Sequence, residues 1–382
     1  MALYSAPSFE ALERLSGTRD ADLINRALID PSRNRGRGAQ TNRDGRFERE
    51  TREAVDDGWG QVEPLHTFDT VEHIERAKTI IARNESPDVG FDRSINPYRG
   101  CEHGCSYCYA RPTHAYLGHS AGLDFERDIY VKVNTVELLR RELSNPRYKA
   151  RPMGIGTNTD PYQPAERKHK LMRGVLETLL ETRHPVMITT KSALIVRDLD
   201  LLTELAKLGL VSVSLSVTSM DHKLSRKMEP RASTPEKRLE AIRLLSEAGV
   251  PTMISASPMI PAINDMELER ILDAGAAQGA RSASMILLRL PGEVRDIFRE
   301  WLLRFFPDRV SHVLNLVRDA RGGKDNDPRF GTRMTGEGPY ATLLRQRFEK
   351  ARERLGLAER MPALRTDLFE PLKVEDRQMS LF

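Results

Sequence analysis

Three cysteines lie within eight consecutive residues, and the chain of 382 residues has no others. Cys101, Cys105 and Cys108 are spaced as C-x3-C-x2-C in the stretch "NPYRGCEHGCSYCYARPTH". Cysteine thiolates are the usual ligands of iron–sulfur clusters, so three of them on one loop can each bind a different iron of a cubic cluster. Gly100 and Gly104 would permit the positive-φ turns that wrap such a loop around a cube. The sequence therefore predicts a cluster with three protein ligands.

A structural zinc ion is the main alternative for these cysteines. Zinc in structural sites takes four ligands, and His103 or His114 could complete a Cys3His set. Such a protein would be a zinc-binding module and not an enzyme. A disulfide framework is not indicated by three clustered cysteines. Thiols that serve as ligands are typical of a reducing compartment, so we expect a cytoplasmic protein.

The cysteine spacing, with an aromatic residue, Tyr107, directly before the last cysteine, resembles the signature of the radical S-adenosylmethionine (SAM) superfamily. The resemblance covers roughly residues 70–300. More narrowly, the cysteine stretch together with "TNTDPYQPAE", "ITTKS" and "MEPRASTPEKRLEAIRLLSEAGVP" resembles the branch related to spore photoproduct lyase. Members of that branch are often labelled DNA repair photolyases.

This resemblance implies a [4Fe-4S] cluster whose fourth iron is open and binds the amino and carboxylate groups of SAM. It implies reductive cleavage of SAM to a 5′-deoxyadenosyl radical, which takes a hydrogen atom from the substrate. The enzyme would belong to the lyase or oxidoreductase class and would need an electron donor such as flavodoxin or ferredoxin. The branch implies a nucleic acid substrate in DNA repair. A protein or small-molecule substrate is the alternative.

The resemblance also suggests which residues hold SAM. Lys191, at the end of a predicted strand, matches the lysine that spore photoproduct lyase uses for the SAM carboxylate, although a solvated surface lysine is the alternative. Ser216 matches a serine on the following strand, and a hydroxyl satisfied within its own strand is the alternative. The loop "GIGTNTD" stands where the superfamily contacts the SAM amino group, or it is an ordinary turn. Its candidate residues are Thr157, Asn158 and Thr159.

Two further pairs of residues are candidates at the site. Tyr107 and Arg231 are predicted to contact the cofactor. Arg231 is also expected to form an ion pair with Glu229, either at the opening of the site or elsewhere on the surface. Spore photoproduct lyase places a hydrogen-donating cysteine on the loop equivalent to "GTNTD", and this chain has no cysteine to spare. Tyr109 and Tyr162 are the candidate hydrogen donors in its place, and both are equally compatible with simple packing roles.

Strands that alternate with helices must position these residues. A strand is predicted around residues 91–95, before the cysteine loop, and five more βα units follow from residue 153. The predicted strands are "MGIGT", "PVMITT", "LVSVSLSV", "VPTMISASP" and "SASMILLRL". This alternation favours a parallel sheet. Six units suit a partial (β/α)6 barrel, with its site at the carboxyl ends of the strands.

Capping residues predict where several helices begin and end. Ser233 or Thr234 should begin one helix and Gly249 should end it, because Ser and Thr cap amino ends and glycine follows carboxyl ends. Gly209 should end the preceding helix, and Asn264 should cap the amino end of the next.

The sequence outside the repeating units predicts three regions. Residues 1–65 read as a flexible basic arm with a short helix near Phe9–Leu15, because the stretch at 31–60 is rich in Gly, Asn and Arg without apolar periodicity. Residues 66–306 form the core. Residues 307–382 should form a mostly helical extension with a loop at 318–339, a basic helix at 340–356 and an extended tail from Met361.

Composition indicates a soluble protein, with 30% charged residues and no apolar run as long as a membrane span. No signal peptide is recognisable at the amino end. The net charge is 59 − 55 = +4, and residues 301–382, with 16 basic and 12 acidic side chains, account for all of it. This excess could face nucleic acid, although a solvated surface explains it equally well.

The chain ends in "QMSLF", which resembles the peptide by which bacterial repair and replication proteins bind the sliding clamp. Gln378 would set the orientation through hydrogen bonds, while Leu381 and Phe382 would fill an apolar pocket. The alternative is that the tail packs against its own domain.

Overall fold

The computed structural model describes residues 36–43, 46–47 and 69–373. Its centre is a seven-stranded sheet in the order β10-β9-β8-β7-β6-β3-β2. Neighbouring strands from β3 to β10 are parallel, and β2 joins the edge antiparallel to β3. The bounds are β2 Ile81–Arg83, β3 Arg93–Ile95, β6 Met153–Ile155, β7 Val186–Thr190, β8 Val211–Ser216, β9 Thr252–Met259 and β10 Ser282–Leu287. These six parallel strands in an open sheet confirm the predicted partial barrel.

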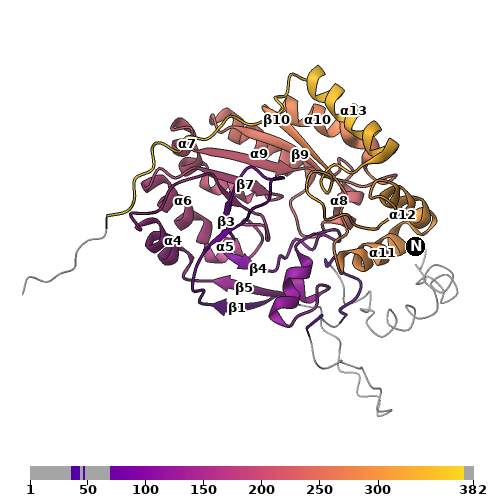
Figure 1. Cartoon of the computed structure of the whole chain (residues 1–382), viewed down its shortest axis with the longest axis horizontal. Helices are drawn as coiled ribbons and strands as arrows, with labels where there is room; N and C mark the ends of the chain where they lie inside the picture. Colours follow the sequence, from indigo (N-terminus) through magenta and orange to yellow (C-terminus); the bar gives the residue numbers. More distant parts are fainter. Residues whose placement is uncertain (1–35, 44–45, 48–68, 374–382) are drawn as a thin grey trace, which may run out of the picture.

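Helices connect successive strands and cover one face of the sheet (Figure 1). Strand side chains alternate between the two faces, so Val186, Ile188 and Val213 point to the helical side and join the main apolar core. The connecting elements are α4 Thr135–Leu143, α5 Glu166–His169, α6 Leu171–Glu181, η2 Ala193–Asp198, α7 Leu199–Lys207, α8 His222–Met228, α9 Pro235–Glu247, η3 Asp265–Glu267 and α10 Leu268–Ala277.

Capping residues behave largely as expected. Thr234 caps α9, since its side chain accepts a hydrogen bond from the Lys237 amide. Gly209 and Gly249 both have positive φ angles after their helices. Asn264 precedes η3 but does not cap it. Its side chain instead bonds the Ile260 amide and two carbonyl groups, because it lies buried in a loop whose backbone groups need partners.

A second, three-stranded sheet interrupts the first βα unit. It has the order β1-β5-β4, where β1 is Val71–Glu75, β4 is Tyr98–Arg99 and β5 is Asp128–Lys132. Figure 1 shows it below the main sheet, next to η1 Arg111–Leu117 and α3 Asp124–Arg127. Residue patterns alone did not predict the strands of this second sheet.

The carboxyl-terminal part continues as helices. It contains α11 Val294–Phe305, η4 Pro307–Arg309, α12 Val310–Asp319 and α13 Gly338–Arg354. The predicted basic helix is α13, which packs on α10 and β10 (Figure 1). The helix α12 was missed, although Val310, Val313 and Val317 have helical spacing and join Trp301 in a second apolar core.

One stretch of the predicted arm is well packed. Within residues 36–43, Arg37, Ala39 and Thr41 are buried, and the Thr41 hydroxyl donates to Glu300 on α11 at 2.7 Å. The composition predicted a flexible arm. These residues are instead held by backbone and polar contacts, which do not require apolar residues at regular spacing in the sequence. The predicted helix at Phe9–Leu15 and the residues of the clamp-like tail lie outside the described residues. No helix in the described part of the chain is long and apolar enough to cross a membrane.

Candidate functional site

The cysteine loop lies between β4 and η1, at the carboxyl end of the first parallel strand, as predicted. Gly100 and Gly104 have φ angles of 76° and 67°, which a residue with a side chain rarely adopts. Cys101 and Cys105 are buried and Cys108 is half-buried. The glycines thus let the backbone turn twice between β4 and η1 while the thiols stay sheltered from solvent.

The three thiols share one electrostatic environment. Burial raises the pKa of Cys101 well above its usual value, and Asp160 and the other two thiols add to the rise. Burial also raises the pKa of Cys105 to about 12, although Lys191 partly opposes this. Such thiols become thiolates only when a cationic group lies between them. The donor set therefore suits a metal centre.

The spacing of the sulfur atoms disfavours a single zinc ion. Ligands of one tetrahedral zinc lie about 2.3 Å from it and hence close to each other. Among the described residues, the three cysteines do not belong to any group of His, Cys, Asp and Glu ligand atoms that all lie within 4.8 Å of one another. His103 instead has its Nδ1 atom 3.3 Å from Asp160. Sulfurs further apart fit separate corners of a cube.

Tyr107 is oriented by a buried carboxylate. Its hydroxyl donates to Glu229, which also pairs with Arg238, and all three side chains are buried. Burial opposes ionisation of Glu229, but Arg238 and then Lys191 outweigh it and lower its pKa below the usual value. The Tyr107–Glu229–Arg238 triad therefore fixes the aromatic ring beside the third cysteine. No local sequence pattern predicted the role of Arg238.

The predicted ion pair between Glu229 and Arg231 is wrong. Glu229 points into the buried triad, while Arg231 pairs with Glu102 at 2.8 Å and its backbone amide donates to the His103 carbonyl. Arg231 thus holds the first half of the cysteine loop from outside. Glu229 pairs with the buried Arg238 and not with Arg231.

Lys191 lies directly after β7, close to the cysteine loop. Its Nζ atom is 5.9 Å from the centre of the Tyr107 ring. Burial would lower its pKa, but Cys105 and Glu229 outweigh this and raise it, so the side chain is a cation. The structure therefore brings Lys191 to the same place as the cysteines, as the strand-end position predicted.

The loop after β6 braces the cysteine loop. The Thr159 hydroxyl donates to the Gly100 carbonyl at 2.6 Å, and Gln163 accepts a hydrogen bond from the Glu102 amide at 3.0 Å. Thr157 and Asn158 contact Asn96 and remain half-buried. The hydroxyl of Thr159 is thereby committed to the loop, which leaves Thr157 and Asn158 as the better candidates for SAM.

Asp160 ties the same loop to β7. Its carboxylate accepts hydrogen bonds from the Thr190 hydroxyl at 2.7 Å and the Lys191 amide at 2.8 Å. Burial would raise its pKa, but His103 and these donors lower it to about 2. Asp160 is thus a charged link between the cysteine loop and the strand that carries Lys191. The stretch "TNTDP" pointed to Asp160 as a residue near the site, but the sequence did not predict its hydrogen-bond partners.

The face of the sheet opposite the helices is lined by small hydroxyl side chains. Ser212, Ser214 and Ser216 are buried on the face of β8 that Val211 and Val213 do not use. The Ser255 hydroxyl on β9 forms a hydrogen bond with Ser257 on the same strand at 3.1 Å. It forms another with Ser284 on β10 at 3.0 Å. A hydroxyl-lined interior with little side-chain bulk suits a polar ligand better than an apolar core does. Ser216, at the end of β8, belongs to this face.

The two candidate tyrosines have different surroundings. Tyr109 is 51% exposed, and its hydroxyl donates to the Thr157 carbonyl beside the loop after β6. Tyr162 is buried, and its hydroxyl donates to Asp198 at 3.2 Å. The structure therefore brings Tyr109 to the site, and it places Tyr162 within the main core.

A buried ion pair supports the cysteine loop from below. Arg111 pairs with Glu126 at 2.5 Å and donates to the Cys105 carbonyl at 2.9 Å. Glu126 also accepts hydrogen bonds from the amides of Gly38 and Ala39 at 2.8 and 2.7 Å. The packed part of the predicted arm is therefore joined to the cysteine loop through one carboxylate. Sequence periodicity carries no signal of such a long-range contact.

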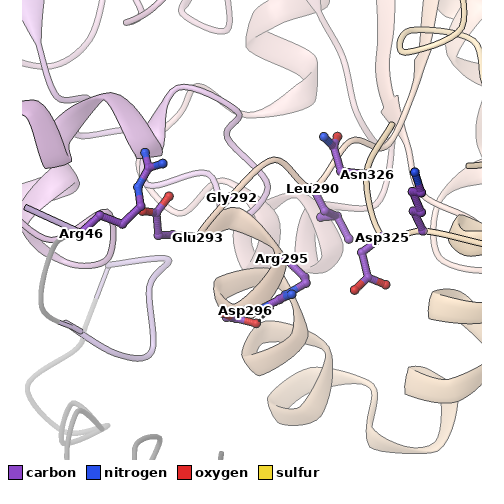
Figure 2. Close-up of a pocket in the computed structure, with 9 residues that line it drawn as sticks. Arg46, Leu290, Gly292, Glu293, Arg295, Asp296, Asp325 and Asn326 are labelled. Carbon is purple, nitrogen blue, oxygen red and sulfur yellow. Dashed lines mark hydrogen bonds and ion pairs between the residues drawn. The ribbon is translucent and has the colours of Figure 1, made fainter. Parts of the chain in front are cut away.

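Figure 2 shows a cleft of about 450 Å³ beside the residues that follow β10. It is lined by equal numbers of basic and acidic side chains, namely Arg46, Arg295, Lys324, Glu293, Asp296 and Asp325. None of the cysteines, Lys191 or the hydroxyl-lined face contributes to it. The cleft therefore has no charge preference of its own and is separate from the cysteine loop.

Sequence comparisons link the chain to a family and to relatives. The family model described as Radical SAM superfamily matches residues 95–275. An uncharacterized protein of Mycobacterium tuberculosis is 38% identical over 242 residues, which cover 62% of this chain and 71% of that protein. An uncharacterized protein of Methanocaldococcus jannaschii is 31% identical over 173 residues, which cover 45% and 62% of the two chains.

Solved structures share the fold. Spore photoproduct lyase complexed with dinucleoside spore photoproduct is similar with a TM-score of 0.55 and 16% identity, over 75% of this chain and 80% of that chain. A mutant of that enzyme with bound AdoMet and the same dinucleoside has the same values. The family match favours an iron–sulfur cluster over the alternative of a Cys3His zinc module. The chain belongs to the radical SAM superfamily, whose enzymes use a [4Fe-4S] cluster and SAM.

Proposed function

We propose that the protein is a radical SAM enzyme that acts on nucleic acid, in the cytoplasm and in a repair reaction. In this proposal Cys101, Cys105 and Cys108 hold the cluster. Once bound, the cluster and SAM supply a carbon radical that abstracts hydrogen from the substrate. The chain's own residues bind and orient SAM, exclude water and present the substrate. A reductant such as flavodoxin or ferredoxin would supply the electron.

The candidate residues for SAM differ in the charge they offer. Lys191 is a cation near Cys105 and would bind the SAM carboxylate. Thr157 and Asn158 offer oxygen acceptors to the amino group. Ser216, at the end of the hydroxyl-lined face, would bind the ribose. Tyr107 would pack beside the cofactor in the orientation that Glu229 imposes.

One observation carries the choice of nucleic acid, namely a row of two exposed aromatic rings that each lie beside an arginine. The Arg289 guanidinium, which follows β10, lies 5.9 Å from the ring of Tyr109, and the Arg333 guanidinium lies 4.6 Å from the ring of Phe330. Tyr109 and Phe330 are 51% and 58% exposed. Exposed rings stack on bases and arginines bind phosphates, which is how proteins bind single-stranded nucleic acid.

The charge on Arg289 is the least compensated in this row. Burial lowers its pKa, and the neighbouring Arg333 lowers it further. Arg333 pairs with Asp88, whereas Arg289 has no ion-pair partner among the described residues. Its Nη1 atom donates only to the Met334 sulfur, at 3.4 Å. An anion such as a phosphate would neutralise Arg289.

A second exposed aromatic pair lies beside Arg46. Phe47 and Tyr116 are both exposed, and their rings stack with centroids 5.5 Å apart. The Arg46 guanidinium, which lines the cleft, is 5.7 Å from the Phe47 ring. This pair would offer another stacking surface to an extended strand.

Tyr109 is also our candidate for the hydrogen donor. All three cysteines are used by the cluster, so none is left to donate a hydrogen atom from sulfur. Tyr109 is exposed near the cysteine loop, whereas Tyr162 is buried with its hydroxyl bonded to Asp198. A phenol at the position of Tyr109 would therefore replace the thiol.

The proposal is tested by equilibrium binding of a fluorescent single-stranded oligonucleotide to the anaerobic holoprotein at several salt concentrations. We expect the logarithm of the affinity to fall linearly with the logarithm of salt concentration. Arg289→Gln should reduce that slope by about 1. Tyr109→Ala should weaken binding by roughly 1–3 kcal/mol.

The matched control is Arg345→Gln, which removes an exposed arginine on α13. It should leave binding unchanged. Binding that does not depend on salt, or equal effects of Arg289→Gln and Arg345→Gln, would instead favour a protein or small molecule as the substrate.

The sliding clamp remains a proposed partner through Gln378, Leu381 and Phe382, which lie outside the described residues. A peptide of residues 370–382 should bind purified clamp at micromolar strength. Replacing Leu381 and Phe382 with alanine should abolish binding. An unchanged affinity would remove this proposal.

A further inference from the structure

A short basic helix, α8, covers one side of the cysteine loop. Its inward side chains Leu224 and Met228 join Cys105 and Tyr107 in the second apolar core. The Met228 carbonyl accepts a hydrogen bond at 3.2 Å from the amide of Ser106, the residue after Cys105. At this point the thickness of one helix separates the cysteine loop from the outer side of α8.

The outer side of α8 carries cations. Lys223 and Arg226 are exposed and Lys227 is half-buried, and residues three and four positions apart lie on the same side of a helix. The helix contains no acidic residue. None of these three side chains has an ion-pair partner among the residues that the structure describes. Their positive charge is therefore not neutralised within this part of the chain.

The acidic residues on either side of α8 in the sequence already have partners. Asp221 caps the helix and accepts hydrogen bonds from its first amides. Glu229, directly after the helix, pairs with the buried Arg238. Glu236 contacts the His222 ring at 2.5 Å. These carboxylates therefore do not pair with the cations on the outer side of α8.

A fourth cation extends this surface onto α11, which lies against α8 (Figure 1). Lys227 Nζ is 5.4 Å and the Arg304 guanidinium is 5.1 Å from the centre of the Phe305 ring. Arg304 donates to the neutral side chain of Gln40, and burial without a counter-charge lowers its pKa. An anionic partner would reduce the repulsion between the two cations that share this ring.

The α8 surface, defined as Lys223, Arg226, Lys227 and Arg304, offers charge without exposed rings. Phe305 and Phe306 are half-buried, and Lys227 Nζ is 5.0 Å from the centre of the Phe306 ring. None of the exposed large apolar side chains among the described residues belongs to α8 or α11. Single-stranded nucleic acid is bound through rings on which bases stack. A charged surface without such rings is better suited to a brief protein encounter that charges steer.

The α8 surface and the candidate SAM residues reach the cysteine loop at different points. The loop after β6 contacts it at Gly100, through the Thr159 hydroxyl, whereas α8 contacts it at Ser106. Enzymes of this superfamily generally need a reductant such as flavodoxin. A protein that docks on α8 would lie one helix away from Cys105 and would leave the loop after β6 free for SAM.

We propose that the α8 surface docks the electron donor, a small one-electron carrier protein with acidic side chains around its redox group. One electron passes from the reduced carrier to the cluster. The carrier is oxidised by one electron and the cluster is reduced by one, and no covalent bond forms or breaks in this step. The proposal rests on the radical SAM activity proposed above, but not on nucleic acid as the substrate.

The test measures binding of fluorescently labelled flavodoxin and ferredoxin to the anaerobic holoprotein with its cluster in place. We expect at least one carrier to bind, with an affinity that falls as salt rises, because salt screens the charges. Lys223→Gln combined with Arg226→Gln should weaken binding about tenfold at low salt, and less at high salt. Both side chains are exposed, and iron per chain equal to wild type would verify that the variant is folded.

The matched control is Arg345→Gln combined with Lys350→Gln, which removes two exposed cations from α13. It should keep the wild-type affinity for the carrier. A second measurement compares 5′-deoxyadenosine formation driven by limiting reduced carrier with formation driven by dithionite, a small inorganic reductant. The ratio of the two rates should fall about tenfold in the Lys223→Gln, Arg226→Gln variant and should not change in the control.

Four results would overturn the proposal. They are binding of neither carrier by the wild type, carrier affinity that does not depend on salt, equal carrier affinities of the two double variants, and loss of oligonucleotide binding without loss of carrier binding in the α8 variant. The last would assign the α8 surface to nucleic acid. Dithionite-driven 5′-deoxyadenosine formation alongside any of these would show that the docking proposal fails while the radical SAM activity stands.

Discussion

Glu229 is a single buried residue on which the arrangement near the third cysteine depends. Its carboxylate lies between the Tyr107 hydroxyl and the Arg238 guanidinium. Glu229→Gln would leave Arg238 buried without a counter-charge. Removing one partner of a buried ion pair costs about 3–5 kcal/mol. We therefore expect a loss of stability of that size, measured by chemical denaturation, together with less iron retained per chain.

The control for this substitution is Glu236→Gln, which removes an exposed glutamate at the amino end of α9. It should change the free energy of unfolding by less than about 0.5 kcal/mol. If Glu229→Gln were as mild as Glu236→Gln, Arg238 would not depend on Glu229, and the triad would not be what orients Tyr107.

Residue types and spacing along the chain indicated the candidate ligands but not the side chains that support them. The sequence indicated Cys101, Cys105 and Cys108 because all three belong to one short loop. It indicated Lys191 because the residue follows a strand whose carboxyl end faces the opening of the barrel. Arg238 and Glu126 were not, because their partners lie elsewhere in the sequence and no local pattern records a buried ion pair.

At the scale of elements, residues 36–43 form a brace on the cysteine loop. A Cβ atom added to Gly38 would lie 1.7 Å from the Gly104 carbonyl oxygen. Gly38→Ala should therefore separate this segment from the loop, since such an overlap cannot be relieved by a side-chain movement. We expect the visible absorption of the reconstituted cluster to bleach several times faster in air.

Gly90→Ala is the matched control, because its added Cβ would meet only the flexible end of Met187, at 3.8 Å. It should bleach at the wild-type rate. Equal bleaching of Gly38→Ala and wild type would show that residues 36–43 do not protect the cluster.

The turn between α6 and β7 carries a buried histidine with a pH-dependent contribution to stability. Burial lowers the pKa of His184 to about 4, and its Nε2 atom bonds the Tyr148 hydroxyl at 2.9 Å. Above about pH 6.5 the ring is neutral in both the folded and unfolded chain. Between pH 6.5 and 4 only the unfolded chain binds the proton, so stability falls as the pH falls.

The expected contribution of His184 is about 2 kcal/mol of lost stability between pH 7.5 and pH 5. Equilibrium unfolding in urea at both pH values should show a fall that is smaller by about this amount in His184→Gln. His312→Gln, which changes an exposed histidine, should keep the full fall. Identical pH dependence in wild type and His184→Gln would mean that folding does not lower the pKa of His184.

Secondary structure was predicted best where the apolar pattern repeats. The six parallel strands and α9 follow from periodicity and capping residues. The strands β1 and β5 were missed because they lie outside the alternation of strands and helices and form a separate sheet with β4. The helix α12 was missed although Val310, Val313 and Val317 have the right spacing, since it follows Phe306 closely with only η4 between.

At the scale of the whole molecule, the fold joins three supports at one loop. The loop after β6 holds the cysteine loop through Thr159 and Gln163, the triad of Tyr107 holds its third cysteine, and residues 36–43 cover it through Glu126. The overall barrel was predictable from alternating strands and helices. The convergence of these supports was not, because it depends on contacts between residues up to 122 positions apart, such as Tyr107 and Glu229.

The most direct measurement is formation of 5′-deoxyadenosine by the anaerobic, reconstituted and reduced protein in the presence of SAM. We expect the wild-type chain to form it, and Cys105→Ala to retain less iron and form none. Lys191→Ala should retain the iron but need more SAM, because the SAM carboxylate loses its cation. No 5′-deoxyadenosine from a wild-type chain with about four irons, or equal amounts from wild type and Cys105→Ala, would contradict the assignment of the cysteine loop.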